Sequence, residues 1–488
     1  MSCSTRCGQA RWSAKAVSRE QCAFFLLVWL LCSASAKLRF RFRTYTDTTA
    51  TMQSRLLAYL TTLLFFVLYT TAVFGAGLNA TERRVAAAAE AENEKVFALL
   101  EQIVNINSGT MNLEGVRQVG AVMRTELEGL GFDVRWVPMD SAKRAGHLIA
   151  EHAGKGRGKR MLLIGHLDTV FEKDSPFQKY ERRGDEIEGP GVNDMKGGLA
   201  IMVSALRAMK HAGTLEPARI IIVLTGDEED AGSPHSISRG DMVEAAKRSD
   251  VALEFESLAR EEGKDMGSIA RRSAMSWTLK ATSQSGHSSG IFANDTGYGA
   301  AYELARILDT FRRELREPNA TYNVGLIVSG ETAQLNAAEI GGTVTGKTNI
   351  IPPIAVAKGD LRTLSNEQTA RIQQRMREIV AQSLAGTKAE LTFDEGYPAM
   401  APTEGSRAYL TMLNEINRDA GLPIMGELDP LKRGAGDIAF VAEEVDGLIG
   451  FGATGEGSHA PGETADATAF DRQIKRAALM MTRLAKMR

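Results

Sequence analysis

Apolar residues after residue 81 follow the spacings of helices and of buried strands. Residues 86–106 and 116–130 carry apolar side chains at helical spacing, and Gly131 is a typical helix end. A further apolar helix is predicted at 199–209. Short continuous apolar runs, which are typical of strands buried on both faces of a mostly parallel sheet, lie at 161–164, 220–224 and 251–255. Strands that alternate with helices in this way predict an α/β domain.

The pattern changes near Gly267, where shorter alternating segments replace the continuous apolar runs. Strands are predicted at 276–281, 323–329, 343–350, 354–362 and 389–393, and helices at 296–315 and 365–384. This order resembles a split βαβ, ferredoxin-like unit. Because helices return after residue 407, we expect this second domain to be inserted into the first. The expected parts are an α/β domain at 81–266 and 396–488, an inserted α+β domain at 267–395 and a targeting region at 1–78.

Residues of the types that bind metals follow the predicted strands. His166, Glu229 and Glu256 each follow the end of a buried apolar run. Ligands in open α/β sheets bind at the carboxyl ends of strands. Asp194 and His459 lie in two glycine-rich loops. Two imidazoles and three carboxylates suit zinc or a similar divalent ion. We therefore predict that these five residues bind two divalent metals, an arrangement typical of hydrolases.

Two neighbouring acids extend this predicted site. Asp168 stands two residues after His166, so the two side chains would point the same way, and its carboxylate can accept the imidazole N–H. Glu228 precedes Glu229 and could take a proton from water as a general base. Each residue alone also has a structural alternative, such as a helix N-cap for Asp194 or a solvated turn for the paired acids.

The charge balance and the cysteines exclude other classes of site. The chain has 488 residues with 58 basic and 60 acidic side chains, and it has no basic field that would indicate a nucleic acid partner. The cysteines all lie in the first few dozen residues, at Cys3, Cys7, Cys22 and Cys32. The rest of the chain can therefore form no disulfide and no thiolate metal site, so its metal chemistry must use His, Asp and Glu.

Two apolar runs near the N-terminus resemble secretory signals. Residues 22–31 follow a basic stretch, and residues 56–74 follow Met52 and Arg55 and end near small residues. We expect translation to start at Met52 and the protein to be exported, to the periplasm or out of the cell, after cleavage of the second run. The alternative is that residues 56–74 remain as a membrane anchor, with a length near the lower limit for a span.

Five segments around these residues, in this order, resemble those of the di-zinc exopeptidases, a family that includes glutamate carboxypeptidases, aminoacylases and succinyl-diaminopimelate desuccinylase. The segments are GHLDTV at 165–170, GPGVNDMKGG at 189–198, TGDEEDAGS at 225–233, ALEFES at 252–257 and GEGSHAPGE at 455–463. The ordered set is highly specific, whereas no single segment would be. HLDTVF, GPGVNDMKGG and the spacing around Glu228 are most similar to the glutamate carboxypeptidase branch.

The resemblance implies two zinc ions per chain that share one carboxylate. The residues it implies as ligands are His166, Asp194 and Glu256 for one ion, and Asp194, Glu229 and His459 for the other. Asp168 would orient the first imidazole, and Glu228 would be the general base. One departure from the family pattern is the additional acid Glu254 in the strand before Glu256, which offers a second carboxylate near that ligand position.

The resemblance also implies that the inserted domain is a lid through which two chains pair as a homodimer. The segment Ser285-Gly286-His287-Ser288 resembles the family motif whose histidine polarises the scissile carbonyl. His287 would then act in the site of the partner chain. Asn349 and Arg362 lie in segments that resemble those holding the carboxylate of the substrate.

These features predict an exported, zinc-dependent hydrolase similar to glutamate carboxypeptidases. It would use metal-activated water to cleave an amide bond next to a free carboxylate in a small peptide or N-acyl amino acid. An N-acyl amino acid deacylase with the same machinery is the nearest alternative. A metal- or peptide-binding protein without turnover is an alternative from another class, although such a protein would have no need of Glu228 as a base.

Overall fold

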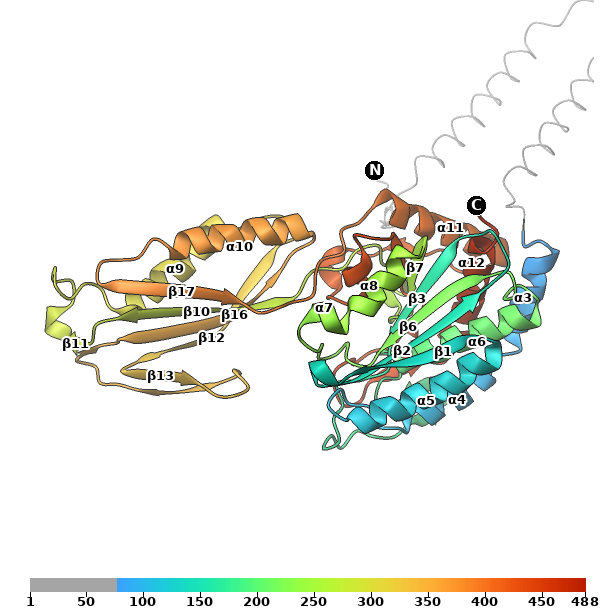
Figure 1. Ribbon diagram of the computed structural model, residues 1–488, viewed down its shortest axis with the longest axis horizontal. Helices are drawn as coiled ribbons and strands as arrows, with labels where there is room; N and C mark the ends of the chain where they lie inside the picture. Colours follow the sequence, from blue (N-terminus) through green and yellow to red (C-terminus); the bar gives the residue numbers. More distant parts are fainter. Residues whose placement is uncertain (1–76) are drawn as a thin grey trace, which may run out of the picture. The chain divides into compact units, whose positions relative to one another are not determined.

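The computed structural model describes residues 77–488, which form two larger β-sheets and the helices that cover them (Figure 1). The two signal-like runs, the expected start at Met52 and the four cysteines lie outside the described residues. Within the described part of the chain, no helix is both long and apolar enough to cross a membrane.

The first sheet has six strands in the order β1-β2-β6-β3-β7-β19. These strands are β1 (Asp133–Met139), β2 (Arg144–Ala153), β3 (Arg160–His166), β6 (Arg219–Thr225), β7 (Val251–Glu254) and β19 (Gly447–Ile449). The neighbours from β6 to β19 are parallel, whereas β1 and β2 join the sheet in the antiparallel sense. The prediction of a mixed α/β fold with a mostly parallel sheet is confirmed.

Helices cover both faces of the first sheet. They are α3 (Ala80–Glu90), α4 (Lys95–Val104), α5 (Leu113–Leu130), α6 (Lys196–His211), α7 (His235–Ser238), α8 (Gly240–Lys247), α11 (Glu404–Ala420), α12 (Thr468–Leu484) and the 3₁₀ helix η4 (Asp437–Val441). In β3, Leu163 belongs to the core formed with α3 to α6, α11 and α12, whereas Leu162 and Ile164 belong to the core formed with α8 and η4. Burial of alternate residues on opposite faces explains why this strand is continuously apolar.

The parallel strands of this sheet end at one edge, and their register places the residues that follow them side by side. His166, the last residue of β3, pairs with Thr225, the last residue of β6. On the other side of β3, Ile164 pairs with Glu254, the last residue of β7. Segments that are far apart in the sequence therefore leave the sheet next to His166.

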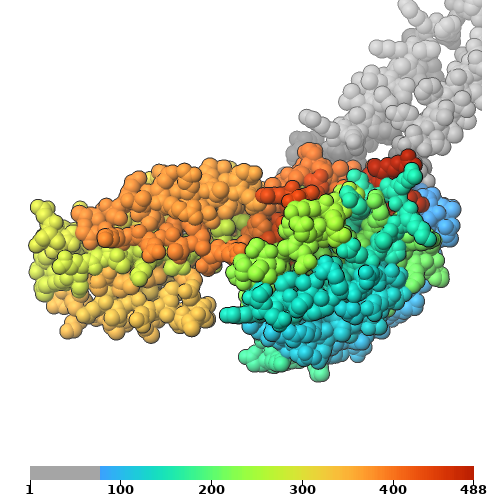
Figure 2. All heavy atoms as spheres, in the orientation of Figure 1, coloured from blue at the N-terminus to red at the C-terminus, as the bar shows by residue number. Residues whose placement is uncertain are grey.

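The second sheet has four strands in the order β12-β16-β10-β17. Its elements are β10 (Met275–Ser283), α9 (Ala300–Glu314), β12 (Thr321–Gly330), β16 (Ile354–Arg362), α10 (Asn366–Val380) and β17 (Thr387–Phe393). Every pair of neighbours is antiparallel. This order is that of a split βαβ unit, and the sheet has a core of its own around Trp277, Leu279 and Phe311. In Figure 2 the surface of this part of the chain is coloured yellow-green to orange.

Shorter elements complete the described chain. They are β4 (Glu181–Arg183), β5 (Glu186–Glu188), β8 (Ala259–Glu261), β9 (Lys264–Gly267), β11 (Gly286–His287), β13 (Thr332–Leu335), β14 (Gly342–Thr345), β15 (Ile350–Ile351), β18 (Gly426–Glu427), β20 (Thr464–Asp466), η1 (Asp140–Ala142), η2 (Ser288–Gly290) and η3 (Pro430–Lys432). The two segments that connect the sheets are themselves joined by the isolated bridges Arg271–Met400 and Ala274–Tyr397.

Several elements expected from the sequence have other bounds in the structure; for example, the helix expected at 365–384 ends at Val380. The single helix expected at 86–106 is two helices, α3 and α4, because residues 91–94 form a turn that places the Glu92 carboxylate beside Lys95 and Arg207. The strand expected at 343–350 is only β14 and the two-residue β15. Helix α9 begins at Ala300 rather than at 296, because Gly297 and Gly299 have positive φ angles that helices do not contain.

Candidate metal centre

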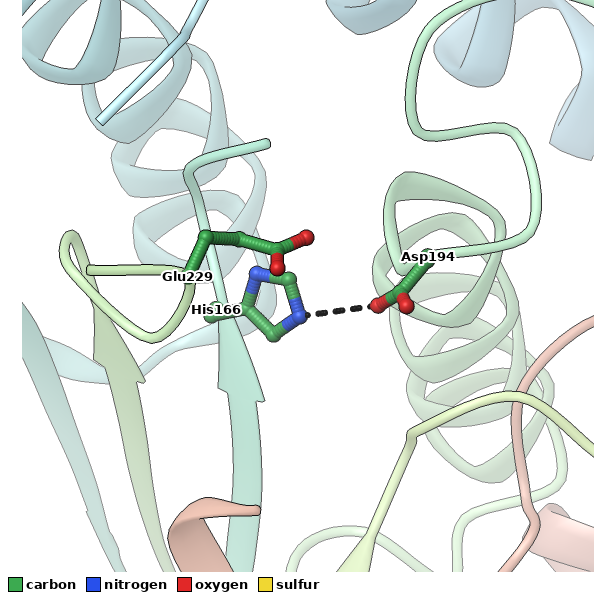
Figure 3. A group of neighbouring side chains, drawn as sticks. All are labelled: His166, Asp194 and Glu229. Carbon is green, nitrogen blue, oxygen red and sulfur yellow. Dashed lines mark hydrogen bonds and ion pairs between the residues drawn. The ribbon is translucent and has the colours of Figure 1, made fainter. Parts of the chain in front are cut away.

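The five predicted metal ligands come together at the carboxyl edge of the first sheet. His166 is the last residue of β3, Glu229 follows β6 and Glu256 follows β7. Asp194 lies in the loop before α6, and His459 lies in the loop before β20. The ligand atoms of His166, Asp194 and Glu229 lie within 4.8 Å of one another (Figure 3). That these residues bind metal remains a prediction, but their placement is the one that the prediction requires.

The Asp194 carboxylate faces two different histidines. Its Oδ1 lies 3.2 Å from His166 Nε2, and its Oδ2 lies 3.2 Å from His459 Nε2. His166 Nε2 is also 3.1 Å from Glu256 Oε1, and His459 Nε2 is 3.2 Å from Glu229 Oε2. The side chains thus form two groups of three that share Asp194. This grouping equals the one implied by the family resemblance.

The spacing of these atoms suits a shared metal as well as hydrogen bonds. Four ligands held about 2.0–2.1 Å from zinc in a tetrahedron lie roughly 3.3 Å from one another. The observed separations of 3.1–3.2 Å agree with that value. In addition, the buried Oε1 of Glu229 has no hydrogen-bond partner among the residues that the structure describes. An acceptor of this kind is satisfied by a bound cation.

Charge in the site also calls for a cation. Burial raises the pKa of Glu228 well above its usual range, and burial raises the pKa of Glu229 to about 7 against the hydrogen bond with His459. Hydrogen bonds with Asp194 and Glu229 raise the pKa of His459 to about 11. Without a metal, protons must therefore take up the excess negative charge, whereas divalent ions would neutralise it while leaving the imidazoles unprotonated.

Asp168 links the imidazole of His166 to the turn that carries Glu228 and Glu229. It is fully buried, and its Oδ1 lies 3.4 Å from His166 Nδ1. The backbone N–H groups of Glu228 and Glu229 donate to its two oxygens at 3.0 and 3.1 Å, and the Thr110 hydroxyl donates at 2.6 Å. His166 Nδ1 also lies 3.1 Å from the backbone oxygen of Asp168, so this one residue holds both the imidazole and the turn of the predicted base. This contact supports the predicted role of Asp168.

The additional acid Glu254 does not reach the two histidines. Its Oε2 accepts from Arg271 Nη1 at 2.7 Å, and its Oε1 accepts from the backbone N–H of Ile438 at 2.8 Å. Glu256, two residues later, lies against His166 instead. The structure therefore favours Glu256 over Glu254 for the ligand position, as predicted from its place nearer the end of the strand.

Glu463 is a structural partner of the site that the sequence analysis missed. It is fully buried, and its Oε1 accepts the backbone N–H groups of Asn193 and Asp194, each at 2.8 Å. Its Oε2 accepts the N–H of Gly191 at 3.0 Å. Because Glu463 follows His459 in the same loop, it ties the loop of one metal ligand to the loop of the shared ligand. The only sequence signal was an acid in the quoted segment 455–463.

A second missed network holds the turn of Glu228. The buried Arg239 donates to Asp227 Oδ1 at 2.7 Å and to Asp437 Oδ1 at 2.8 Å. It also donates to the Tyr397 hydroxyl, which in turn donates to the backbone oxygen of Glu228 at 2.6 Å. Tyr397 lies in a segment that connects the two sheets. These partners are distant in sequence, so no local pattern could have identified them.

The three residues predicted in the inserted part lie elsewhere. His287 is exposed, and its Nδ1 lies 2.8 Å from Ser289 Oγ. Asn349 accepts the backbone N–H of Ser288 and so lies beside the same segment. Arg362 donates to Asp360 at 3.0 Å. In the described part of the chain, no hydrogen bond or ion pair joins any of these three to the five ligands.

Comparison with known proteins identifies the family. Residues 162–487 match the family described as Peptidase family M20/M25/M40. The chain therefore belongs to this family, which confirms the resemblance to the di-zinc exopeptidases. It is accordingly an enzyme of the metallopeptidase and amidohydrolase class, in a family for which zinc dependence and a dinuclear metal site are typical.

Individual relatives agree with this assignment. The chain is 27% identical over 405 residues to carboxypeptidase G2 from Pseudomonas sp. (strain RS-16), covering 81% of this chain and 90% of the relative. It is 26% identical over 295 residues to succinyl-diaminopimelate desuccinylase from Leptothrix cholodnii, covering 58% and 72%. The fold is similar to that of the M20 family metallo-carboxypeptidase Sso-CP2 from Sulfolobus solfataricus, with a TM-score of 0.58, 16% identity and coverage of 80% and 99%.

We predict that Glu463→Ala weakens metal binding about 10- to 100-fold, because it leaves three N–H groups of the Asp194 loop without their acceptor. Competition with a chromogenic chelator measures the affinity. Glu463→Gln, which retains one acceptor oxygen, should bind metal with an affinity between those of the wild type and Glu463→Ala. The exposed Glu456 of the same loop provides the control variant Glu456→Ala, which should bind metal normally. Equal affinities for Glu463→Ala and Glu456→Ala would exclude the positioning role.

Proposed function

We propose that this enzyme is an exported, carboxypeptidase-like hydrolase that cleaves an amide bond next to a free carboxylate. The observation that carries the proposal is the Asp194 carboxylate, which spans two groups of ligand-type side chains with the half-buried acid Glu228 beside them. The similarity to carboxypeptidase G2, which extends over 90% of that relative, supports the choice within the family. Small peptides and N-acyl amino acids are the substrate classes that suit such a site.

The reaction consumes one water and yields a carboxylate and an amine. Two divalent ions, with zinc as the typical metal of the family, would supply Lewis-acid activation of the water and of the carbonyl group when bound. Glu228 accepts a proton from the attacking water and then delivers it to the nitrogen of the leaving amine. Burial and neighbouring acids raise the pKa of Glu228, and bound divalent ions would lower it again, so that the carboxylate is free to take a proton.

Arg362 and Asn349 would hold the free carboxylate of the substrate. A guanidinium offers two parallel donors to a carboxylate and so fixes the register of the substrate. Among residues 77–488, Arg362 is paired only through Nε with Asp360, and its side chain is 35% exposed, so donors remain for a ligand. Asn349 precedes β15, beside the His287 segment. The structural alternative is a surface ion pair of Arg362 with Asp360.

The second sheet would be a lid through which two chains pair. Its strand β12 is an edge strand, and Val324 and Ile327 on it are 37% and 55% exposed. An edge strand with exposed apolar residues is suited to pairing with a second copy. His287, also exposed, would then polarise the scissile carbonyl in the site of the partner chain.

Export after cleavage of residues 56–74, or anchoring by them, belongs to this proposal as well and would be tested by sequencing the mature N-terminus.

An N-acyl amino acid deacylase is the second candidate function. The chain is 30% identical over 223 residues to acetylornithine deacetylase from Proteus mirabilis, covering 42% of this chain and 54% of the relative. The two functions share the chemistry and differ in the acyl side of the amide bond, which is a peptide residue in one and a simple acyl group in the other. Turnover of dipeptides compared with N-acetyl amino acids distinguishes them.

The replacement Glu228→Gln tests the mechanism. It keeps the shape of the side chain but removes the proton acceptor, so turnover of an N-blocked dipeptide should fall by about two to four orders of magnitude. Metal content, measured on the same sample by plasma emission spectrometry, should stay near that of the wild type. The matched control is Asp230→Asn, the same chemical change on the exposed end of this turn, where activity should be retained. Normal turnover by Glu228→Gln would remove Glu228 from the role of base.

Mixing two inactive variants tests whether His287 acts in trans. His287→Ala and Glu228→Gln should each be inactive alone. If His287 serves the partner site, every mixed dimer contains one site with both wild-type residues, and random exchange should restore about a quarter of wild-type activity. Subunit exchange is followed by mass spectrometry of the native dimers. Exchange without recovered activity, or a monomer at assay concentration, would contradict the trans role.

A further inference from the structure

Glu228 is held in place through its own peptide groups. In the chain from residue 77 to residue 488, its carboxylate takes part in no hydrogen bond or ion pair, so no neighbouring side chain fixes its direction. Its backbone N–H donates to Asp168 Oδ1 at 3.0 Å, and its backbone oxygen accepts the Tyr397 hydroxyl at 2.6 Å. The place of the predicted base therefore depends on these two contacts. Asp168 also contacts His166, whereas the metal chemistry assigns no part to Tyr397.

The Tyr397 hydroxyl acts as a donor toward Glu228. Arg239 Nη2 donates to the phenolic oxygen at 3.1 Å, and a guanidinium cannot accept in return, so the phenolic proton is left for the Glu228 oxygen. Burial raises the pKa of Tyr397, which keeps this proton on the hydroxyl group. Among the described residues, no other hydrogen bond to the Glu228 oxygen is present. The contact therefore runs in one direction, from Tyr397 to the turn of the base.

Arg239 and an aromatic neighbour give the hydroxyl a rigid support. Arg239 is 1% exposed, and it donates to Asp227 Oδ1 at 2.7 Å and to Asp437 Oδ1 at 2.8 Å. The Tyr397 ring packs edge-on against Phe440, with the ring centroids 4.9 Å apart. The hydroxyl is thus held by groups other than its own backbone, so it can position the turn of the base rather than follow it.

Tyr397 belongs to the segment that joins the two sheets. Its backbone N–H donates to the Ala274 oxygen at 2.8 Å, and its backbone oxygen accepts the Ala274 N–H at 3.1 Å. Two residues earlier, Glu395 Oε2 accepts the Ser233 hydroxyl at 2.9 Å. The residues 226–233 are therefore bound to the joining segment at two points, Glu228 and Ser233. A shift of this segment would move the turn that carries the base.

We propose that Tyr397 is a positioning residue for catalysis, because its hydroxyl couples the segment that joins the two sheets to the backbone of the general base. The base stands in its working position only while Tyr397 is seated between Arg239 and Glu228. This inference rests on the proposed function, in which Glu228 takes a proton from water. It adds a group that touches neither substrate nor metal and acts through Glu228 alone.

Tyr397→Phe removes one hydroxyl and leaves the ring. Arg239 Nη2 still has the Asp227 backbone oxygen at 3.1 Å, so only the Glu228 oxygen loses its partner. On an N-blocked dipeptide or an N-acetyl amino acid, whichever the wild type cleaves, kcat should fall about tenfold, as expected for one lost hydrogen bond, while KM should change less than about twofold. Metal affinity, measured by competition with a chromogenic chelator, should equal that of the wild type. Weaker metal binding would assign the contact to Glu229 instead and overturn the inference.

The same change in the Glu228→Gln background separates positioning from a general loss of structure. If Tyr397 acts through Glu228, the hydroxyl has nothing left to position once the base is gone. The double variant should therefore turn over at the rate of Glu228→Gln alone. A merely structural Tyr397 would lower the rate by the same factor in both backgrounds, and that result would overturn the inference.

Tyr409→Phe is the matched control. Its hydroxyl also donates to a backbone oxygen, that of Asp250 at 3.0 Å. Asp250 precedes β7 and so lies at the opposite end of that strand from Glu256. The kcat and KM of this variant should equal those of the wild type. A loss of kcat as large as that of Tyr397→Phe would mean that the loss of any such hydroxyl slows the enzyme, which would overturn the inference.

Hydrogen exchange tests the contact without any substrate. In the metal-loaded protein, peptides spanning 226–233 should exchange about tenfold faster in Tyr397→Phe than in the wild type, because the N–H groups of Glu228 and Glu229 bond to Asp168 only while the turn is closed. Tyr409→Phe should leave this rate unchanged. If the wild type cleaves neither substrate, the proposed function fails, and the exchange rates still decide whether Tyr397 holds the turn. Equal exchange in Tyr397→Phe and the wild type would overturn the inference.

Discussion

Crowding of carboxylates at one edge of the parallel sheet is the constraint on which the rest of this structure depends. Acidic side chains that would repel one another converge there from the ends of three strands and from two loops. Isolated charges of this kind are too costly to bury. The fold resolves the conflict in three ways: by buried arginines, by backbone N–H donors and by the space for divalent cations between the histidines.

Each of these three devices acts on different acids. Arg271 neutralises Glu254, and Arg239 is bound between Asp227 and Asp437. Backbone N–H groups surround Asp168 and Glu463, which carry no metal but position the loops that do. The acids left over are those that face the histidines. Among the described residues, Asp194 and Glu229 pair with no arginine or lysine, whereas Glu256 also pairs with Arg271 and Arg433, so the two acids around His459 depend most on a bound cation.

The sequence was sufficient for the parts of this account that depend on local pattern. His166 follows a run of buried residues, and parallel strands place such ends at a common edge, so the convergence of the ligands could be foreseen. The contact of Asp168 with His166 could be expected from their spacing of two residues. The single helix expected at 86–106 is interrupted by a turn at 91–94, where Glu92 lies 3.5 Å from Arg207, more than a hundred residues away. Long-range partners also explain why Glu463 and Tyr397 were missed.

The account requires two metals that share Asp194, and anomalous X-ray diffraction from crystals of the metal-loaded protein tests this most directly. Data collected at the zinc absorption edge should show two peaks, each about 2.0–2.2 Å from a different oxygen of Asp194. One peak should lie beside His166 and Glu256, and the other beside His459 and Glu229. A single peak, or two peaks of which one is not bound by Asp194, would contradict the account.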